Sequence, residues 1–196
     1  MYEARIFNIP ELKGISKRTI DEHMKLYQGY VKHTNLIHDK IKELSADAEG
    51  NAFMIGELRR RLGFEFDGMR NHEYYFEQLE GGSADLDSST ALYKKIVTDF
   101  GSFEDCHKQM VALAMTRGVG WAICYYDSVA NRLLLAWVEE QQLGHLTGLH
   151  FILGLDMWEH SYMLDYAPSE KKKYIEAFFQ NINGKVVAER FEKAAE

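Results

Sequence analysis

A short apolar run that ends in an acidic residue constrains the fold of this chain more than any other stretch. Residues 151–155, Phe-Ile-Leu-Gly-Leu, have the length and apolar character of a buried β-strand. Asp156 follows directly, and His160 lies four residues later, where we expect the chain to turn into a helix. This spacing could bring a carboxylate and an imidazole to one metal ion if the chain bends between them. A buried hydrogen-bonded pair explains the same residues equally well.

Composition and charge exclude several classes of protein. The 196 residues are 46% hydrophobic and 27% charged, which is typical of a globular protein with one domain or two small ones. The net charge of -7 argues against a nucleic-acid partner, because a duplex-binding protein needs a basic face. No apolar run of about 18 residues is present, so we expect no membrane span. Residues 1–5 lack the apolar segment of a signal peptide.

The two cysteines bear on the compartment. Cys106 falls in a predicted helix and Cys124 in a predicted strand, and their spacing is not that of a metal site. We interpret both as buried thiols in a reducing environment. The sequence therefore favours a cytoplasmic protein.

The first part of the chain predicts two long antiparallel helices. Ser16 is a good N-cap, and apolar residues then recur at helical spacing as far as Leu44. The polar stretch 45–50 interrupts this pattern, and a second helical segment runs over residues 52–79. Two long helices joined by a short turn are typical of an antiparallel hairpin.

The glycine-rich stretch 80–85 is the predicted domain boundary. We predict an N-terminal helical hairpin domain over residues 1–82 and a C-terminal α+β domain over residues 83–196. In the second domain, helices are predicted from Ser88 or Ser89 to 100 and from Ser102 to 117. Strands over 120–126, over 132–141 and from 151 form a three-stranded antiparallel sheet. Helices from Ser169 to 182 and from Lys185 close the chain.

Three stretches resemble the iron/manganese superoxide dismutase family. Residues 156–166, Asp-Met-Trp-Glu-His-Ser-Tyr-Met-Leu-Asp-Tyr, are similar to the family signature DxWEHAYYLDY and depart from it at Ser161 and Met163. Residues 68–76 resemble the GxxNHxxFW stretch, and residues 99–103 resemble the DFGS turn. The resemblance covers nearly the whole chain and implies a helical hairpin followed by an α+β domain that carries metal ligands.

The resemblance also implies an activity and a site. The activity is conversion of superoxide to O2 and H2O2 at one manganese or iron ion per chain, in a homodimer or homotetramer. The implied metal ligands are His23, His72, Asp156 and His160. Imidazole and carboxylate ligands suit iron or manganese by type.

Two further residues match positions that act on the reaction. Tyr30 matches the family's gateway tyrosine, which lies in the substrate path and joins the proton network. Gln141 matches the glutamine that hydrogen-bonds the bound solvent in manganese-type members, and Gly68 stands where iron-type members usually place that glutamine. This combination leans toward manganese, although Gln142 and His145 lie close enough to confuse the register.

The first histidine ligand is where the match breaks. Counting back from Tyr30 through the family pattern HHxxHHxxYV places the ligand at Glu22, whereas counting forward from Ile15 places it at His23. On a regular helix His23 and Tyr30, seven residues apart, share a face, whereas Glu22 and Tyr30 are about 80° apart. A π-bulge could bring an eight-residue pair together. We favour His23, with Glu22 as the alternative.

Departures at the implied dimer interface keep other functions open. Tyr162 matches a tyrosine that pairs with a histidine of the partner subunit, but that histidine position is Leu26 here. Glu159 matches a glutamate that reaches the metal-binding histidine of the partner. One alternative is therefore a dismutase-fold metal-binding protein with little or no dismutase activity. Another is a non-catalytic interaction domain whose histidines are core residues.

Overall fold

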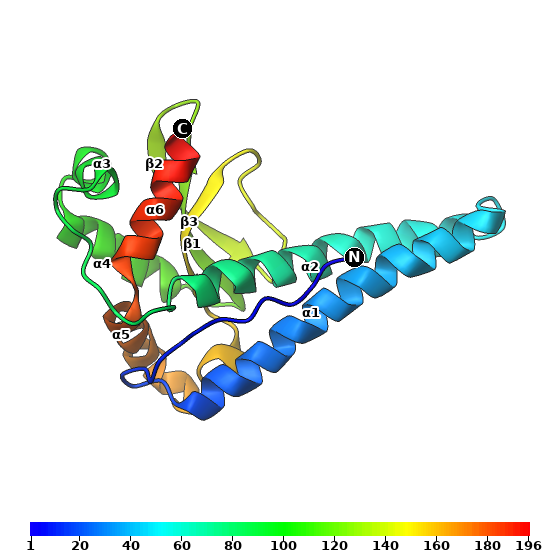
Figure 1. The fold of residues 1–196 in the computed structure, drawn as a ribbon, viewed down its shortest axis with the longest axis horizontal. Coiled ribbons are helices and arrows are strands. Elements are labelled where there is room, and N and C mark those ends of the chain that lie inside the picture. The colour runs from blue at the N-terminus through cyan, green and yellow to red at the C-terminus, as the bar shows by residue number, and fades with distance from the viewer.

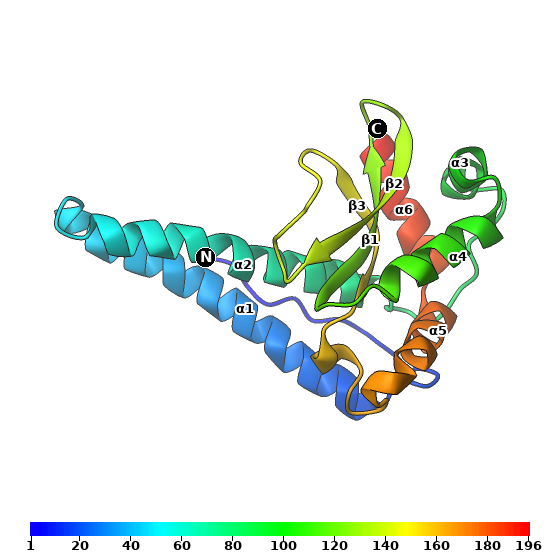
Figure 2. The ribbon, with the colours of Figure 1, turned by 180° about the vertical axis from the view of Figure 1, so that it is seen from behind.

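A long helical hairpin and a smaller α+β region make up the structure, a computed structural model that describes residues 1–196 (Figure 1). Helix α1 spans Lys17–Leu44 and helix α2 spans Ala52–Glu77, with a 3-10 turn at Ser45–Asp47 between them. The two helices are antiparallel, and their connecting turn projects away from the rest of the molecule (Figures 1 and 2). The predicted hairpin is confirmed.

Helix α1 begins where the sequence predicts. The Ser16 side chain accepts a hydrogen bond from the Thr19 backbone N–H, which satisfies one of the free donors of the first turn. Buried residues then recur every three or four positions, so that one stripe of the helix is covered. This stripe consists of Thr19, Ile20, His23, Tyr27, Val31, Thr34 and Ile37. A histidine thus belongs to the buried face of α1.

The sheet is antiparallel and has the strand order β2-β1-β3. Its strands are β1 at Gly120–Asp127, β2 at Arg132–Glu139 and β3 at His150–Asp156. In the register of β1 with β3, Trp121 lies opposite Asp156. The central strand therefore places a tryptophan beside the last residue of β3. The predicted three-stranded sheet is confirmed.

Strand β2 ends two residues earlier than the sequence predicts. Glu140 has a positive φ of 51°, and Glu139 and Leu143 exchange backbone hydrogen bonds, so the chain turns back on itself after Glu139. A left-handed residue cannot continue a strand. Gln141 consequently lies in a tight turn rather than on the strand.

Helices surround the sheet in the C-terminal region (Figure 2). They are α3 at Ala91–Phe100, α4 at Phe103–Ala114, α5 at Lys171–Asn181 and α6 at Gly184–Ala195, with 3-10 turns at Glu159–Ser161 and Pro168–Glu170. Ser102 caps α4 as predicted, whereas Thr90, and neither Ser88 nor Ser89, caps α3. Helix α4 contacts β1 and β2, while α2 and α6 contact β3.

The hairpin and the sheet share one hydrophobic core. A single cluster of buried residues includes Tyr27 of α1, Phe76 of α2, Trp121 of β1 and Phe178 of α5. Polar contacts fasten the same junction, because Gln78, just after α2, donates to the Gly154 carbonyl of β3. The division into two domains at residues 82 and 83 stays a prediction. The junction of hairpin and sheet is where the candidate site lies.

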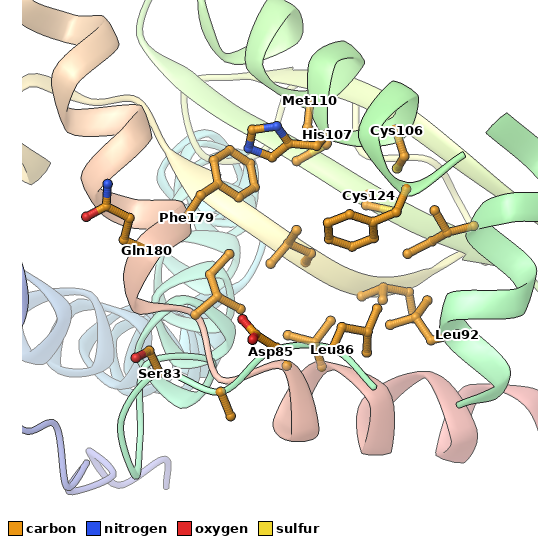
Figure 3. A pocket seen from close by; sticks show the side chains of 18 of the residues that line it. Ser83, Asp85, Leu86, Leu92, Cys106, His107, Met110, Cys124, Phe179 and Gln180 are labelled. Atoms are coloured by element: carbon orange, nitrogen blue, oxygen red, sulfur yellow. The ribbon is translucent and has the colours of Figure 1, made fainter. Parts of the chain in front are cut away.

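An apolar cavity of about 660 Å³ lies between α4, α6 and the sheet. Figure 3 shows Leu92, Cys106, Met110 and Cys124 among the side chains that line it. Both cysteines are buried and unpaired, as predicted. Burial raises the pKa of the Cys106 thiol to about 11 and also raises that of Cys124, so neither is a ready thiolate. None of the helices combines the length and apolar character that a membrane crossing requires.

Candidate metal centre

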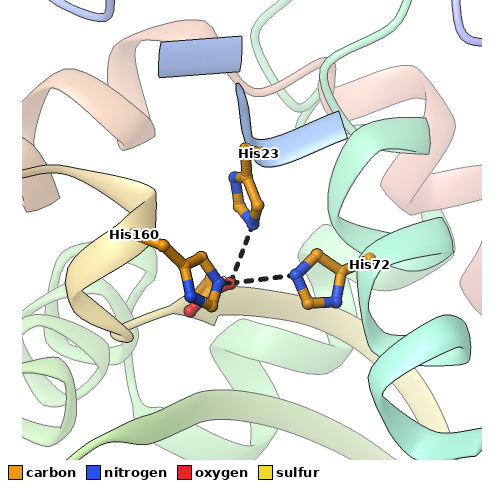
Figure 4. A group of neighbouring side chains, drawn as sticks. His23, His72 and His160 are labelled. Atoms are coloured by element: carbon orange, nitrogen blue, oxygen red, sulfur yellow. Dashed lines mark hydrogen bonds and ion pairs between the residues drawn. The ribbon is translucent and has the colours of Figure 1, made fainter. Parts of the chain in front are cut away.

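Four side chains from four separate segments converge at the junction of hairpin and sheet. His23 comes from α1, His72 from α2, Asp156 from the end of β3 and His160 from the following 3-10 turn. Their potential ligand atoms all lie within 4.8 Å of one another. Figure 4 shows the three imidazoles directed toward a common centre. All four residues that the sequence proposed as metal ligands are therefore brought together.

One carboxylate oxygen is the centre of this cluster. Asp156 Oδ2 lies 3.0 Å from Nε2 of His23, 3.2 Å from Nε2 of His160 and 3.5 Å from Nε2 of His72. Asp156, His23 and His72 are fully buried. Three imidazole nitrogens thus face one carboxylate oxygen in a site whose side chains are mostly shielded from solvent.

The hydrogen bond of His72 determines which of its nitrogens carries the proton. Its Nδ1 lies 2.5 Å from the Gly68 carbonyl one turn earlier in α2. A carbonyl only accepts, so Nδ1 carries the proton and Nε2 has a free lone pair. That Nε2 is buried without a hydrogen-bond partner and faces the Asp156 oxygen. Two acceptors facing each other in a buried space repel, so a cation between them fits the residues present.

Asp156 is oriented by its own neighbours. Its Oδ1 accepts a hydrogen bond from the Trp158 backbone N–H at 2.8 Å, which leaves Oδ2 directed at the imidazoles. Its main-chain carbonyl accepts from Ser161 Oγ at 3.0 Å and from the Tyr174 hydroxyl at 2.9 Å. Burial acts to raise the pKa of Asp156, but His160 and His23 outweigh it and hold that pKa well below its usual range. The carboxylate is therefore charged and could offset part of a metal ion's charge.

The two buried histidines are neutral. Burial lowers the pKa of His23 and lowers that of His72 well below its usual value. The neutral imidazole is the form that binds metals. His160 is 20% exposed in its side chain, and its ring stacks on Trp158 with centroids 5.7 Å apart. The cluster thus has a buried interior and one edge closer to solvent.

Glu22, the alternative first ligand, lies outside the cluster. Its carboxylate is exposed and lies 2.7 Å from the Lys25 Nζ on the surface of α1. Helix α1 is α-helical without interruption from Lys17 to Leu44. With no π-turn in α1, His23 and Tyr30 lie on the same side of the helix.

Tyr30 and Gln141, the two residues proposed to act on the reaction, are hydrogen-bonded to each other. Gln141 Nε2 donates to the Tyr30 hydroxyl at 3.1 Å, and Gln141 Oε1 accepts from Trp121 Nε1 at 2.9 Å. The Tyr30 ring lies 5.1 Å from the His72 ring, measured between centroids. Burial raises the pKa of Tyr30, so its hydroxyl stays protonated. Gln142, the neighbouring candidate, lies beside Gly63 instead.

Gly68 allows Tyr30 to approach the cluster. A Cβ atom at this position would lie 2.6 Å from a ring carbon of Tyr30, which is closer than van der Waals contact permits. The small residue that the sequence singled out therefore makes room for the phenol and also supplies the carbonyl that holds His72.

Sequence reasoning missed several residues that hold the site. Tyr174 and Ser161 fix the Asp156 main chain, and Phe64 lines the space between Tyr30 and Trp158, with ring centroids 5.9 and 6.4 Å from theirs. Ser161 follows a metal-ligand candidate directly, and this adjacency was a usable signal. Tyr174 and Phe64 carry no local signal, because only the fold brings them to the site.

Known proteins resemble the chain over most of its length. A family described as "Iron/manganese superoxide dismutases, C-terminal domain" matches residues 88–190. A superoxide dismutase [Fe] of Aquifex pyrophilus is 37% identical over 188 residues, which cover 93% of this chain and 87% of the relative.

Relatives named for either metal match. A superoxide dismutase [Fe] of Cupriavidus metallidurans is 35% identical over 94% of this chain and 92% of its own length. A superoxide dismutase [Mn] of Halobacterium salinarum is 34% identical over 89% of this chain and 84% of its own length. These similarities, with the converging histidines and aspartate, show that the chain belongs to the iron/manganese superoxide dismutase family.

Proposed function

We propose that this chain is a superoxide dismutase, which converts two superoxide anions and two protons to O2 and H2O2 at one iron or manganese ion. The observation that carries the proposal is the convergence of three imidazole nitrogens on one oxygen of a charged, buried Asp156. The unpaired Nε2 of His72 supports a metal in particular, because its lone pair faces another acceptor. Membership of the family supports the reaction.

The proposed ligands are His23, His72, Asp156 and His160. When bound, iron or manganese would supply the one-electron chemistry, because each has a divalent and a trivalent state. The protein's part is to provide three neutral imidazoles and one carboxylate, and to hold them away from bulk water. His23, and not Glu22, is the proposed first ligand because its Nε2 lies in the cluster while the Glu22 carboxylate lies at the surface.

Tyr30 is proposed to donate protons in the reaction, and Gln141 is proposed to position it. The Tyr30 hydroxyl keeps its proton because burial raises its pKa, and its side chain is half-buried with its ring 5.1 Å from that of His72. The raised pKa makes the hydroxyl a weak acid, so it gives its proton only to the strongly basic, reduced form of the substrate and then recovers one from water. Gln141 Nε2 holds the Tyr30 oxygen in place by its hydrogen bond. We leave the metal as manganese or iron, with Gln141 and Gly68 favouring manganese.

A homodimer or homotetramer is the proposed assembly. Leu26 of α1 and Met163 and Leu164, just after the 159–161 turn, are 43%, 46% and 47% exposed. Helix α1 contacts that turn, so these side chains lie on neighbouring segments. A second copy would remove such apolar surface from water. Sedimentation of the purified protein measures the assembly.

A dismutase fold that binds metal with little activity is the second candidate. The observation in its favour is the exposed Leu26, which stands where the family pairs a histidine with a tyrosine of the other subunit. Without that histidine, part of the polar bridge across a dimer would be absent. The metal site itself is unaffected by this change.

Metal analysis and activity assays on iron-loaded and manganese-loaded protein test the proposal. We expect about one ion per chain and rapid dismutation with at least one metal. A full site with negligible turnover would favour the second candidate. Protein that takes up neither metal would defeat both.

Two alanine variants test the first ligand. His23→Ala should lose most of its bound metal, because it removes a buried imidazole from the cluster. Glu22→Ala, the matched control on the adjacent residue, should retain it, because that side chain is exposed. Metal release by Glu22→Ala together with retention by His23→Ala would reverse the assignment.

A further inference from the structure

His145 lies at the contact between α2 and the turn that carries Gln141. Its side chain is half-buried, and it borders a cavity lined by residues of α2, β1, the 145–151 stretch and α6. Its Nε2 lies 3.0 Å from the Gln141 carbonyl oxygen, and its Nδ1 lies 2.6 Å from the Tyr125 hydroxyl of β1. One imidazole thus joins the central strand to the backbone of Gln141.

The direction of each hydrogen bond follows from the partners. The Gln141 carbonyl only accepts, so Nε2 of His145 carries a proton and donates to it. With this proton on Nε2, Nδ1 accepts from the Tyr125 hydroxyl. The Asn71 side-chain amide donates to the same carbonyl at 3.0 Å. Its nitrogen also lies 3.3 Å from His145 Nε2, but with a proton on Nε2 both groups are donors, so this contact is not a hydrogen bond. The Gln141 carbonyl therefore receives two donors, one from α2 and one from His145.

These contacts determine where the amide nitrogen of the Gln141 side chain points. Trp121 fixes the amide oxygen, and the two donors fix the main chain, so Nε2 is directed at Tyr30. The bond from Gln141 Nε2 to Tyr30 is 3.1 Å long, and a main-chain shift of about 1 Å would lengthen it beyond hydrogen-bond range. The hydrogen bond between Gln141 and Tyr30 therefore forms only while the Gln141 main chain is held in place.

We propose that His145 is a positioning residue for the reaction, which acts by anchoring the Gln141 main chain so that the Gln141 amide stays bonded to Tyr30. The effect on turnover rests on the proposed function, whereas the effect on the Gln141 hydrogen bonds does not. If His145 only stabilised the turn by packing, the Gln141–Tyr30 hydrogen bond would not depend on which ring nitrogen donates.

Two conservative variants separate the two ring nitrogens. In His145→Gln the side-chain amide can occupy the place of Nε2 and still donate to the Gln141 carbonyl. In His145→Asn the shorter amide reaches only the place of Nδ1, so the donor to Gln141 is lost. His145→Ala removes both contacts, and Tyr125→Phe removes only the hydroxyl that donates to Nδ1. His150→Gln is the matched control, since His150 is exposed and follows the same loop.

Hydrogen exchange of the Gln141 side-chain amide in the metal-free, nitrogen-15-labelled full chain is the main measurement. We expect His145→Ala and His145→Asn to speed this exchange about tenfold, equal to ~1.4 kcal/mol. Tyr125→Phe should speed it about threefold, and His145→Gln and His150→Gln should stay within about twofold of the parent protein. In metal-loaded protein, kcat should follow the same order at unchanged metal content.

The amide measurement keeps this inference separate from the proposed function, because it requires neither metal nor turnover. An inactive metal-loaded protein with tenfold faster amide exchange in His145→Asn would defeat only the dismutase assignment. Unchanged amide exchange in both His145→Ala and His145→Asn, even with a lower midpoint of thermal unfolding, would overturn the positioning role. Equal rescue by His145→Asn and His145→Gln would overturn it too.

Discussion

His72 and His23 enter the same cluster from the two helices of one hairpin, and different forces hold them. His72 donates from Nδ1 to the Gly68 carbonyl of its own helix. His23 has no such bond on Nδ1, which is buried without a partner, and its hydrogen bond is made by Nε2 with Asp156 Oδ2 in the cluster itself. Aromatic rings surround it instead, with the centroids of Tyr75 and Phe76 at 4.9 and 5.0 Å.

The two kinds of contact determine different properties of an imidazole, namely its position and its tautomer. A hydrogen bond to a carbonyl fixes both the position of an imidazole and the nitrogen that carries its proton. Ring packing fixes position alone, so the tautomer of His23 follows from what its Nε2 meets. A proton on the unpartnered Nδ1 costs about 1–3 kcal/mol, because a buried donor has lost its water. The tautomer of His72 is therefore already the one that a metal needs. The tautomer of His23 becomes that one only when a metal binds its Nε2.

Gly68→Ala should produce the largest change on the His72 side. The new Cβ would lie 2.6 Å from the Tyr30 ring, and the overlap would move Tyr30 or the helix segment whose carbonyl holds His72. Overpacking costs about 1–3 kcal/mol, which exceeds the gain of about 0.5–1 kcal/mol from replacing a helical glycine. We expect a net loss of stability in urea denaturation and metal affinity lowered at least tenfold.

Gly56→Ala is the control for the helix itself. A Cβ at position 56 of the same helix would have no atom within 4 Å, so only the propensity gain of about 0.5–1 kcal/mol applies. The comparison between His72 and His23 would be wrong if both alanine variants were equally stable and bound metal equally well.

Phe76→Leu should act more mildly, and on the His23 side. Phe76 is fully buried and lies closer to the His23 ring than to the His72 ring, at 5.0 against 6.2 Å. Its loss should lower stability by about 1–2 kcal/mol and metal affinity about threefold, since His23 loses part of its packing. Phe178→Leu removes a buried ring that contacts neither histidine and should cost similar stability with unchanged affinity. Equal affinity losses in the two variants would mean that ring packing does not position His23.

The same contrast marks how far sequence reasoning reaches. The hairpin follows from the Ser16 cap and the spacing of apolar residues, which are local and periodic signals. The four-residue spacing of Asp156 and His160 after a strand-like run fits a metal site and a buried hydrogen-bonded pair equally well, and only the resemblance of residues 156–166 to the family signature favoured the metal site. His23 required a choice between two counts that differ by one residue, and the geometry of a regular helix favoured the side chain that the structure places in the cluster.

What sequence reasoning missed depends on contacts between distant residues. Tyr174 reaches the Asp156 main chain across 18 residues, and Asn71 reaches Gln141 across 70. The end of β2 was predicted too late because the positive φ of Glu140 has no composition signal, since glycine or asparagine is the usual residue in that conformation. His145 looked like a competitor for the position of Gln141, while the structure shows it as a neighbour that binds the Gln141 backbone.

The smallest expected effect is the order in which the two histidines accept protons in the metal-free protein. Burial lowers the pKa of both, but the hydrogen bond to Asp156 acts to raise that of His23, whereas His23 and His160 lower that of His72 further. As the pH falls, His23 should therefore titrate before His72 in a carbon-13 NMR titration. Titration of His72 first would contradict the comparison.

The sign of the accompanying stability change follows from linkage. A folded-state pKa below the unfolded value of about 6.5 means that the unfolded chain binds more protons as the pH drops past 6.5. The free energy of unfolding should thus have its full value above that pH. At lower pH it should decrease by at most about 1.4 kcal/mol per pH unit for each histidine. His23→Gln should reduce this slope, and His38→Gln, at an exposed position, should leave it unchanged. A slope insensitive to His23→Gln would mean that folding does not lower the pKa of His23.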